Sequence, residues 1–172
     1  EPAICKIIEI IKPQLDTPAA LAIFAPFAPH IAEKFGEKEL FGVVEKSIQE
    51  TPIKIALGLA IFECLSGYSD DLPFDLPDAL MFKFLNLLVN DEEFVRNAAF
   101  STISALIEND IFIHTDQTQA LLKIYPLINQ RAPNREDLIL FFKLLRKLLR
   151  VEGVSEEVVT ELFDFSMENI SI

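Results

Sequence analysis

The sequence predicts an all-α fold of stacked helical hairpins, an α-solenoid, and two observations indicate it. One is an apolar helical pattern that occurs three times at intervals of 42 residues, starting at Ile53, Val95 and Asp137. The other is a second apolar pattern in the segments between, which recurs at intervals of about 40 residues. Two alternating helices with this period are typical of stacked helix pairs, in which neighbours cover one another's apolar sides.

Length and composition set broad limits. The chain has 172 residues, of which 51% are hydrophobic and only five are Gly. This composition excludes a disordered chain and favours helices covered on two sides. The longest apolar run, Ala19 to Ala32, contains prolines and is shorter than the roughly 20 residues that cross a bilayer, so we expect no membrane span. Because the chain starts at Glu1 without an initiator Met or a leader, we expect it to belong to a longer protein.

The first two helices are predicted near the N-terminus. Isoleucines at helical spacing predict a helix from Ala3 to Gln14. Thr17 and the proline after it form an N-cap and a first helical position, so the second helix begins there. Pro26 and Pro29 each remove a backbone donor, and we expect this helix to break or kink before it ends at Gly36.

The rest of the chain alternates between two types of helix. The first type carries the apolar sets Leu40, Phe41, Val44, Ile48; Leu80, Met81, Phe84, Leu88; Ala120, Leu121, Ile124, Ile128; and Val158, Val159, Leu162, Phe165. The second type carries Ile53, Ala56, Leu57, Ala60, Ile61, Cys64, Leu65; Val95, Ala98, Ala99, Thr102, Ile103, Leu106, Ile107; and Leu140, Phe141, Leu144, Leu145, Leu148, Leu149. Each set lies on one side of its helix, so the repeating unit is a hairpin.

Turn signals separate these helices. The predicted N-caps are Thr51, Asp91, Asn134 and Ser155, and the predicted stops are Gly67, Asn109 and Gly153. Residues Tyr68 to Pro77 are predicted as a longer connection. We therefore expect one solenoid over residues 1–172, with hairpins at approximately 3–36, 37–67, 77–109 and 115–151 and a further helix at 155–169.

One segment carries a family resemblance. Between Asn90 and Ala99, Asp91 lies in the turn and Val95 and Arg96 are followed by small residues. This pattern resembles the second helix of a HEAT repeat, and Pro126 is similar to the proline that often kinks the first helix. The resemblance covers nearly the whole chain and implies a right-handed superhelix of HEAT- or armadillo-like hairpins. It also implies structural roles for Asp91, Val95 and Arg96, with the arginine paired to turn groups of its own or a neighbouring repeat.

Charge and cysteine content indicate the kind of partner and compartment. A net charge of −12 disfavours nucleic acid and anionic membranes, which require clustered cations, so we expect protein partners. The two cysteines, Cys5 and Cys64, fit a reducing intracellular compartment, the cytoplasm or the nucleus. Apolar surface at terminal hairpins leads us to expect self-association through them.

The sequence shows no catalytic or metal-binding pattern. It contains no Gly-rich phosphate loop and no cysteine pair at metal spacing, and His30 and His114 are isolated from each other. We therefore predict a protein that is not an enzyme and that has no cofactor and no metal.

Basic residues are concentrated in one stretch of this acidic chain. Residues 131–150 have a net charge of +4, whereas the remainder sums to −16. Two interpretations remain open at this point, a solvated helix face or a docking strip for an acidic or phosphorylated segment, which guanidinium groups bind well. The candidate partner-binding residues are Arg131, Arg135, Lys143, Arg146, Lys147 and Arg150.

The function predicted from these features is a non-enzymatic scaffold for protein–protein interactions. One alternative is a segment of an importin-like nuclear transport receptor, since acidic solenoids attract basic partners. Another is a helical enzyme domain with an unrecognised site. A closed helical bundle is the alternative fold, although the repeated spacing argues against it.

Overall fold

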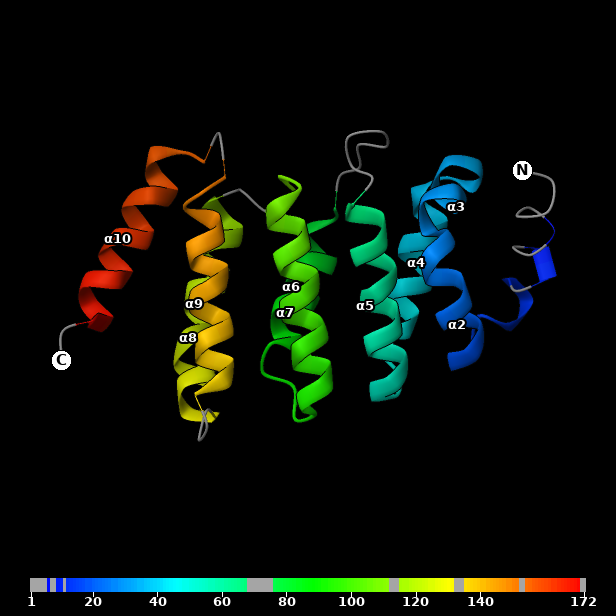
Figure 1. Cartoon of the computed structure of the whole chain (residues 1–172), viewed down its shortest axis with the longest axis horizontal. Helices are drawn as coiled ribbons and strands as arrows, with labels where there is room; N and C mark the ends of the chain where they lie inside the picture. Colours follow the sequence, from blue (N-terminus) through cyan, green and yellow to red (C-terminus); the bar gives the residue numbers. More distant parts are fainter. Residues whose placement is uncertain are drawn as a thin grey trace.

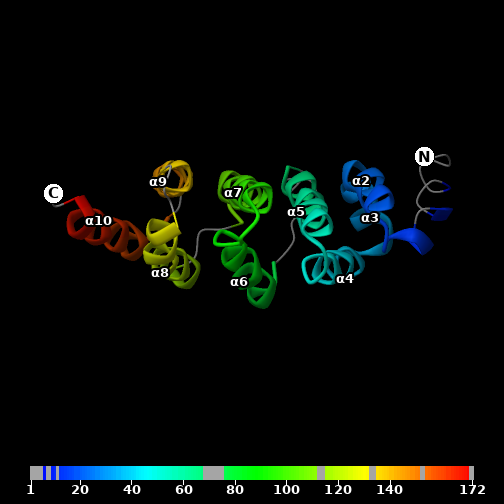
Figure 2. The same cartoon turned by 90° about the horizontal axis from the view of Figure 1, so that it is seen from below.

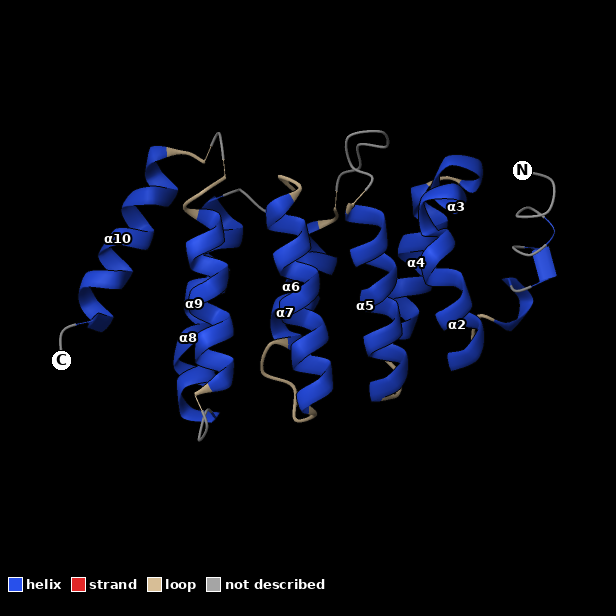
Figure 3. Ribbon diagram, viewed as in Figure 1, coloured by secondary structure: helices blue, strands red, loops and turns tan. Residues whose placement is uncertain are grey.

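A computed structural model describes residues 6, 9–10, 12–67, 76–111, 115–131, 135–151 and 154–170. Every regular element in these ranges is a helix (Figure 3), as the sequence predicts. Within the described part of the chain, no helix is both long and apolar enough to span a membrane. Half of the residues predicted as a helix from Ala3 to Gln14, and most of the connection from Tyr68 to Pro77, lie outside the described residues. The predictions for Cys5, His114, Asn134 and Gly153 fall entirely outside them.

The second predicted helix, which begins at Pro18, is interrupted at Pro26, as the prolines predict. After η1 (Lys12–Gln14), the backbone N–H of Ala20 donates to Thr17 Oγ1 at 3.3 Å, and α2 begins. A short 3-10 turn containing Pro26, η2 (Ala25–Phe27), separates α2 (Pro18–Phe24) from α3 (Ala28–Phe35). Gly36 follows with a positive φ of 86°, a conformation that glycine adopts without strain, so α3 ends there.

The remaining helices alternate as the two sequence patterns predict. Their bounds are α4 (Glu37–Ser47), α5 (Pro52–Ser66), α6 (Asp78–Leu87), α7 (Glu93–Glu108), α8 (Thr115–Arg131), α9 (Glu136–Leu148) and α10 (Glu156–Ile170). Pro126 lies inside α8 and is exposed.

These helices form an elongated array in which the chain advances steadily from one end to the other (Figure 1). Viewed along the helices, they lie in two layers (Figure 2). The α5 layer contains α2, α5, α7 and α9, whereas the α4 layer contains α4, α6, α8 and α10. In the α5 layer, α5 contacts α7 and α7 contacts α9; in the α4 layer, α6 contacts α8 and α8 contacts α10. The core therefore runs along the array between the layers.

Side-chain hydrogen bonds join helices of the same layer at the period of the repeat. In the α5 layer, Thr102 Oγ1 donates to the Leu59 carbonyl at 3.2 Å, across a separation of 43 residues. In the α4 layer, Lys83 Nζ donates to Glu45 Oε1 at 2.6 Å, across 38 residues. Further bonds of this kind, from Arg96, Ser101, Thr115, Gln119 and Lys147, span 38–43 residues. Arg131, at the end of α8, donates across 42 and 40 residues to Val89 and Asp91 in the turn between α6 and α7.

Burial on α7 and α9 follows the predicted register closely. The matched buried positions, 42 residues apart, are Val95 and Asp137, Ala99 and Phe141, Thr102 and Leu144, Ile103 and Leu145, and Leu106 and Leu148. Leu149 departs from the prediction, because it is 54% exposed. A similar departure occurs on α10, where Val158 is buried but Val159 is exposed.

The register predicted for α5 is wrong by one residue. Six buried α5 residues lie 41, not 42, residues before buried residues of α7, and Ile53 is 57% exposed. Apolar side chains occupy every side of α5, so the spacing alone does not indicate which side faces the core. The six residues are Gly58, Leu59, Ile61, Phe62, Leu65 and Ser66.

Of the predicted N-caps that the structure describes, Ser155 forms the expected hydrogen bond, whereas Asp91 and Thr51 do not. The backbone N–H of Val158 donates to Ser155 Oγ at 3.3 Å, which confirms that cap. The cap predicted at Asp91 is wrong: Glu92 is the N-cap of α7, and its N–H donates to Asn90 Oδ1 at 3.0 Å. Thr51 has the extended conformation of an N-cap but makes no side-chain cap hydrogen bond.

Candidate functional site

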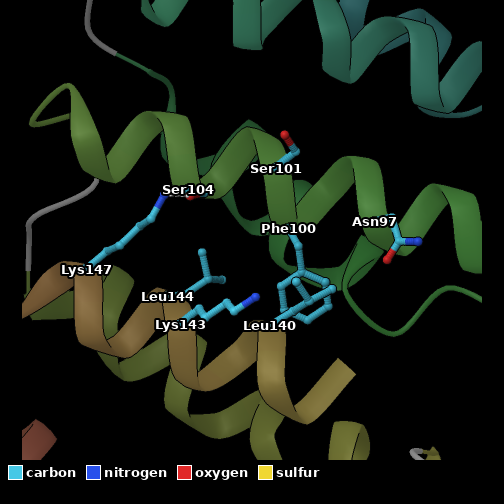
Figure 4. Close-up of a pocket in the computed structure, with 8 residues that line it drawn as sticks. All are labelled: Asn97, Phe100, Ser101, Ser104, Leu140, Lys143, Leu144 and Lys147. Carbon is cyan, nitrogen blue, oxygen red and sulfur yellow. Dashed lines mark hydrogen bonds between the residues drawn. The ribbon is translucent and has the colours of Figure 1, made fainter. Parts of the chain in front are cut away.

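The candidate site is an open groove between α7 and α9 with a volume of about 290 Å³ (Figure 4). Phe100 of α7 and Leu140 and Leu144 of α9 form its apolar floor, and Phe100 is only 2% exposed. These residues face one another because α7 and α9 pack side by side in the α5 layer. Polar side chains line the edges: Asn97, Ser101, Ser104, Lys143 and Lys147.

On the α9 edge of the groove, the charged side chains are Lys143 and Lys147. We use the name basic patch for these two lysines together with Arg146 and Arg150, which do not line the groove; the first three residues lie at helical spacing on α9, and Arg150 lies just after the helix. Lys147 Nζ donates to Ser104 Oγ and pairs with Glu108 of α7. Within the part of the chain that the structure describes, the other three cations form no ion pair, and all three are exposed.

The six basic residues selected from the sequence do not form one strip. Arg131 ends α8 and donates to the Val89 carbonyl and to Asp91 Oδ1, in the turn before α7. Arg135 is the N-cap of α9, exposed and with a left-handed backbone. Arg146 lies eleven positions after Arg135, about 16 Å along the helix axis. Arg131 and Arg135 therefore lie at the opposite end of α9 from most of the basic patch.

Of the three residues assigned structural roles, Arg96 forms a partly buried ion pair with Asp137. Arg96 Nη1 donates to the carbonyls of Asn90 and Asp91 at 2.9 and 3.0 Å, in its own turn. Its Nε donates to Asp137 Oδ2 of α9 at 2.8 Å, and the two side chains are only 17% and 10% exposed. Val95 is fully buried. Arg96 thus joins its own turn to the next hairpin.

Sequence reasoning missed two sets of residues. The first set is the pair of Arg96 and Asp137, since the third apolar pattern starts at Asp137 and indicates no partner for it. A buried carboxylate needs a counter-ion, and Arg96 directly follows Val95, the residue that matches Asp137 in the 42-residue repeat. The α7 side of the groove was also missed. Its signal is the spacing of three and four that places polar or aromatic residues together on α7, namely Asn97, Phe100, Ser101 and Ser104.

The groups with catalytic or metal-binding potential lie elsewhere. Burial raises the pKa of the half-buried Cys64 thiol, and the neighbouring Glu63 carboxylate raises it further, so this cysteine is a weaker nucleophile than a free thiol. His30 is exposed on α3. Among the residues described, no group of three or more His, Cys, Asp or Glu could hold a metal ion. The groove, by contrast, offers an apolar floor with ammonium, hydroxyl and amide donors, which suits binding of an anionic segment.

The chain matches no protein-family model, and neither a curated protein nor a solved structure is significantly similar to it. No relative therefore assigns a role to any residue of the groove.

Proposed function

We propose that this protein is a non-enzymatic scaffold that binds other proteins through the groove and the basic patch. The observation that carries the proposal is the position of Lys143, Arg146 and Arg150, three exposed cations without ion-pair partners in the described structure, on an otherwise acidic chain. Lys143 and Arg146 each lie within one helical turn of Leu144 in the apolar floor. An extended acidic or phosphorylated segment is the ligand that this combination fits, because its anions pair with the cations while its apolar side chains contact the floor.

We also propose that the array is a right-handed superhelix of HEAT- or armadillo-like hairpins. The support comes from hydrogen bonds that join helices of one layer at separations of 38–43 residues, the period expected for such hairpins. Long open arrays of this type offer extended surfaces for partners. The thiol of Cys64, free in this structure, is compatible with the proposed intracellular location.

The experiment that tests the binding proposal reverses charges in the basic patch. The double variant Lys143→Glu with Arg146→Glu changes two exposed residues. We expect it to weaken binding of a fluorescein-labelled acidic peptide, measured by anisotropy, by at least about tenfold. We also expect the affinity of the variant to depend less on salt, because fewer ion pairs are formed.

A charge-matched control is Lys38→Glu with Lys123→Glu, two exposed lysines on α4 and α8. This variant has the same net charge, so it should retain the affinity of the unmodified protein. Equal losses in both double variants would mean that the peptide responds to overall charge and not to the basic patch, and the proposal would fail.

A further inference from the structure

Neighbouring helices of the α5 layer pack through matching positions. Phe100 and Ile107 of α7 are buried, and Phe100 lies against Leu140 of α9 in the groove (Figure 4). The residues 42 positions later, Phe142 and Leu149 of α9, are 39% and 54% exposed. In the described part of the chain, no helix lies beyond α9 in this layer (Figure 2). Among the described residues, the side of α9 that matches the buried side of α7 is therefore only partly covered. Phe142 contacts Tyr125 of α8, with ring centroids 6.1 Å apart, and Leu149 is more than half exposed.

The charges on this side of α9 are opposite to those on α7. On α7, Ser104 and Glu108 accept hydrogen bonds from Lys147 of the following helix. The positions 42 residues later are Arg146 and Arg150, both exposed. Suppose that another helix packs on α9 as α9 packs on α7. Its residue equivalent to Lys147 would then face Arg146 and Arg150, so an acidic residue would fit that position.

Helix α10 also carries exposed apolar residues. Val159 and Phe163 are spaced by four residues on one side of α10 and are 44% and 63% exposed. Helix α10 lies in the α4 layer, beyond α8, so the place beyond α9 and next to α10 is open (Figure 2). A helix in that place would lie beside both α9 and α10.

We propose that this side of α9 docks an acidic amphipathic helix of a partner protein. We use the name docking face for Phe142, Arg146, Leu149 and Arg150. The apolar stripe of the helix covers Phe142 and Leu149, and its carboxylates pair with Arg146 and Arg150, in the manner of helix-in-groove recognition. The inference rests on the proposed scaffold function, because it specifies the class of partner and where that partner lies.

Three synthetic peptides of about 18 residues test the inference, a length at which a designed sequence forms appreciable helix. The first has a leucine stripe at helical spacing flanked by glutamates. The second has the same stripe flanked by lysines, and the third is the first peptide with two central residues replaced by prolines, which prevent a helix. We expect the first to bind at least about tenfold more tightly than either of the others, measured by fluorescence anisotropy.

Variants of the docking face supply the site-specific test. Phe142→Asp and Leu149→Asp should each weaken binding of the glutamate peptide at least about tenfold, and the pair Arg146→Glu with Arg150→Glu should make the lysine peptide the tighter ligand. The matched control is Phe82→Asp, which changes a phenylalanine of α6 that is 43% exposed and should leave binding unchanged. Thermal melts identify any variant that fails to fold, and Leu149→Asp, the more exposed position, keeps the test valid if Phe142→Asp unfolds.

The outcomes separate this inference from the proposed function. If the glutamate and proline peptides bind equally and Phe142→Asp has no effect, the helix-docking inference fails while acidic-segment binding stands. If no peptide binds, both fail. If sedimentation shows that the free protein is a dimer that Phe142→Asp dissociates, a second copy of the chain occupies the docking face and the inference is overturned.

Discussion

Arg96 and Asp137 link two consecutive hairpins through a partly buried ion pair. The guanidinium also donates to two carbonyls of its own turn, so it holds the turn before α7 and the first turn of α9 in one arrangement. Arg131 makes an ion pair to the same turn, but its partner Asp91 is almost fully exposed. Solvent screens that second pair, so the two arginines should differ in their effect on stability although they contact the same turn.

Replacing Arg96 with alanine should therefore lower the free energy of unfolding by about 2–3 kcal/mol, since it leaves the Asp137 carboxylate buried without a partner. Arg131→Ala is the matched control and should cost less than about 1 kcal/mol. The double variant Arg96→Met with Asp137→Val should recover most of the loss, because Val95 occupies the matching position on α7. Urea denaturation measures the free energy of unfolding of all three variants. If Arg96→Ala and Arg131→Ala cost the same, Arg96 does not have the structural role inferred from its contacts.

At the scale of elements, the packing of α4 against α5 depends on one glycine. Gly58 is buried on α5, and a Cβ atom placed there would lie 2.9 Å from Ser47 Cβ on α4. Real side chains do not approach so closely, so the two helices could accommodate a larger residue only by moving apart. Gly42, on the exposed side of α4, has no atom within 4 Å of the same construction.

The two glycines should consequently respond in opposite ways to alanine. Gly58→Ala is expected to destabilise the protein by about 1–2 kcal/mol, because the cost of overpacking exceeds the gain in helix propensity. Gly42→Ala should stabilise it by roughly 0.5–1 kcal/mol through propensity alone. Thermal denaturation of both variants measures these changes in stability. A stabilising Gly58→Ala would show that α4 and α5 are not in close contact at this position.

At the scale of the whole molecule, stability is distributed along the array. The strongest contacts join helices of one pair or of adjacent pairs, and the hydrogen bonds between pairs span no more than 43 residues. Such a molecule has one core that extends along its length, so its ends have fewer neighbours than its centre. The exposed apolar residues Phe142, Leu149 and Phe163 are found towards one of these ends.

This shape can be measured in solution. A compact chain of 172 residues would have a radius of gyration of about 16 Å, and we expect small-angle scattering to give a clearly larger value and an asymmetric distance distribution. The measurement should be made at several concentrations, to separate elongation from self-association. A value near 16 Å with a symmetric distribution would indicate the closed bundle instead.

The sequence by itself determined the helical class, the alternation of two helix types, the break at Pro26 and the burial pattern of α7 and α9. These features are local, since propensity, caps and amphipathic spacing act within a few turns of helix. Only the tertiary structure decided which side of α5 is buried, because that helix is apolar on every side. It also decided that Asp137 pairs with Arg96, that Arg131 and Lys147 are bound by the preceding hairpin, and that Arg146 and Arg150 are not. Each of these pairings joins residues about 40 positions apart, and stacking, not local sequence, brings such residues together.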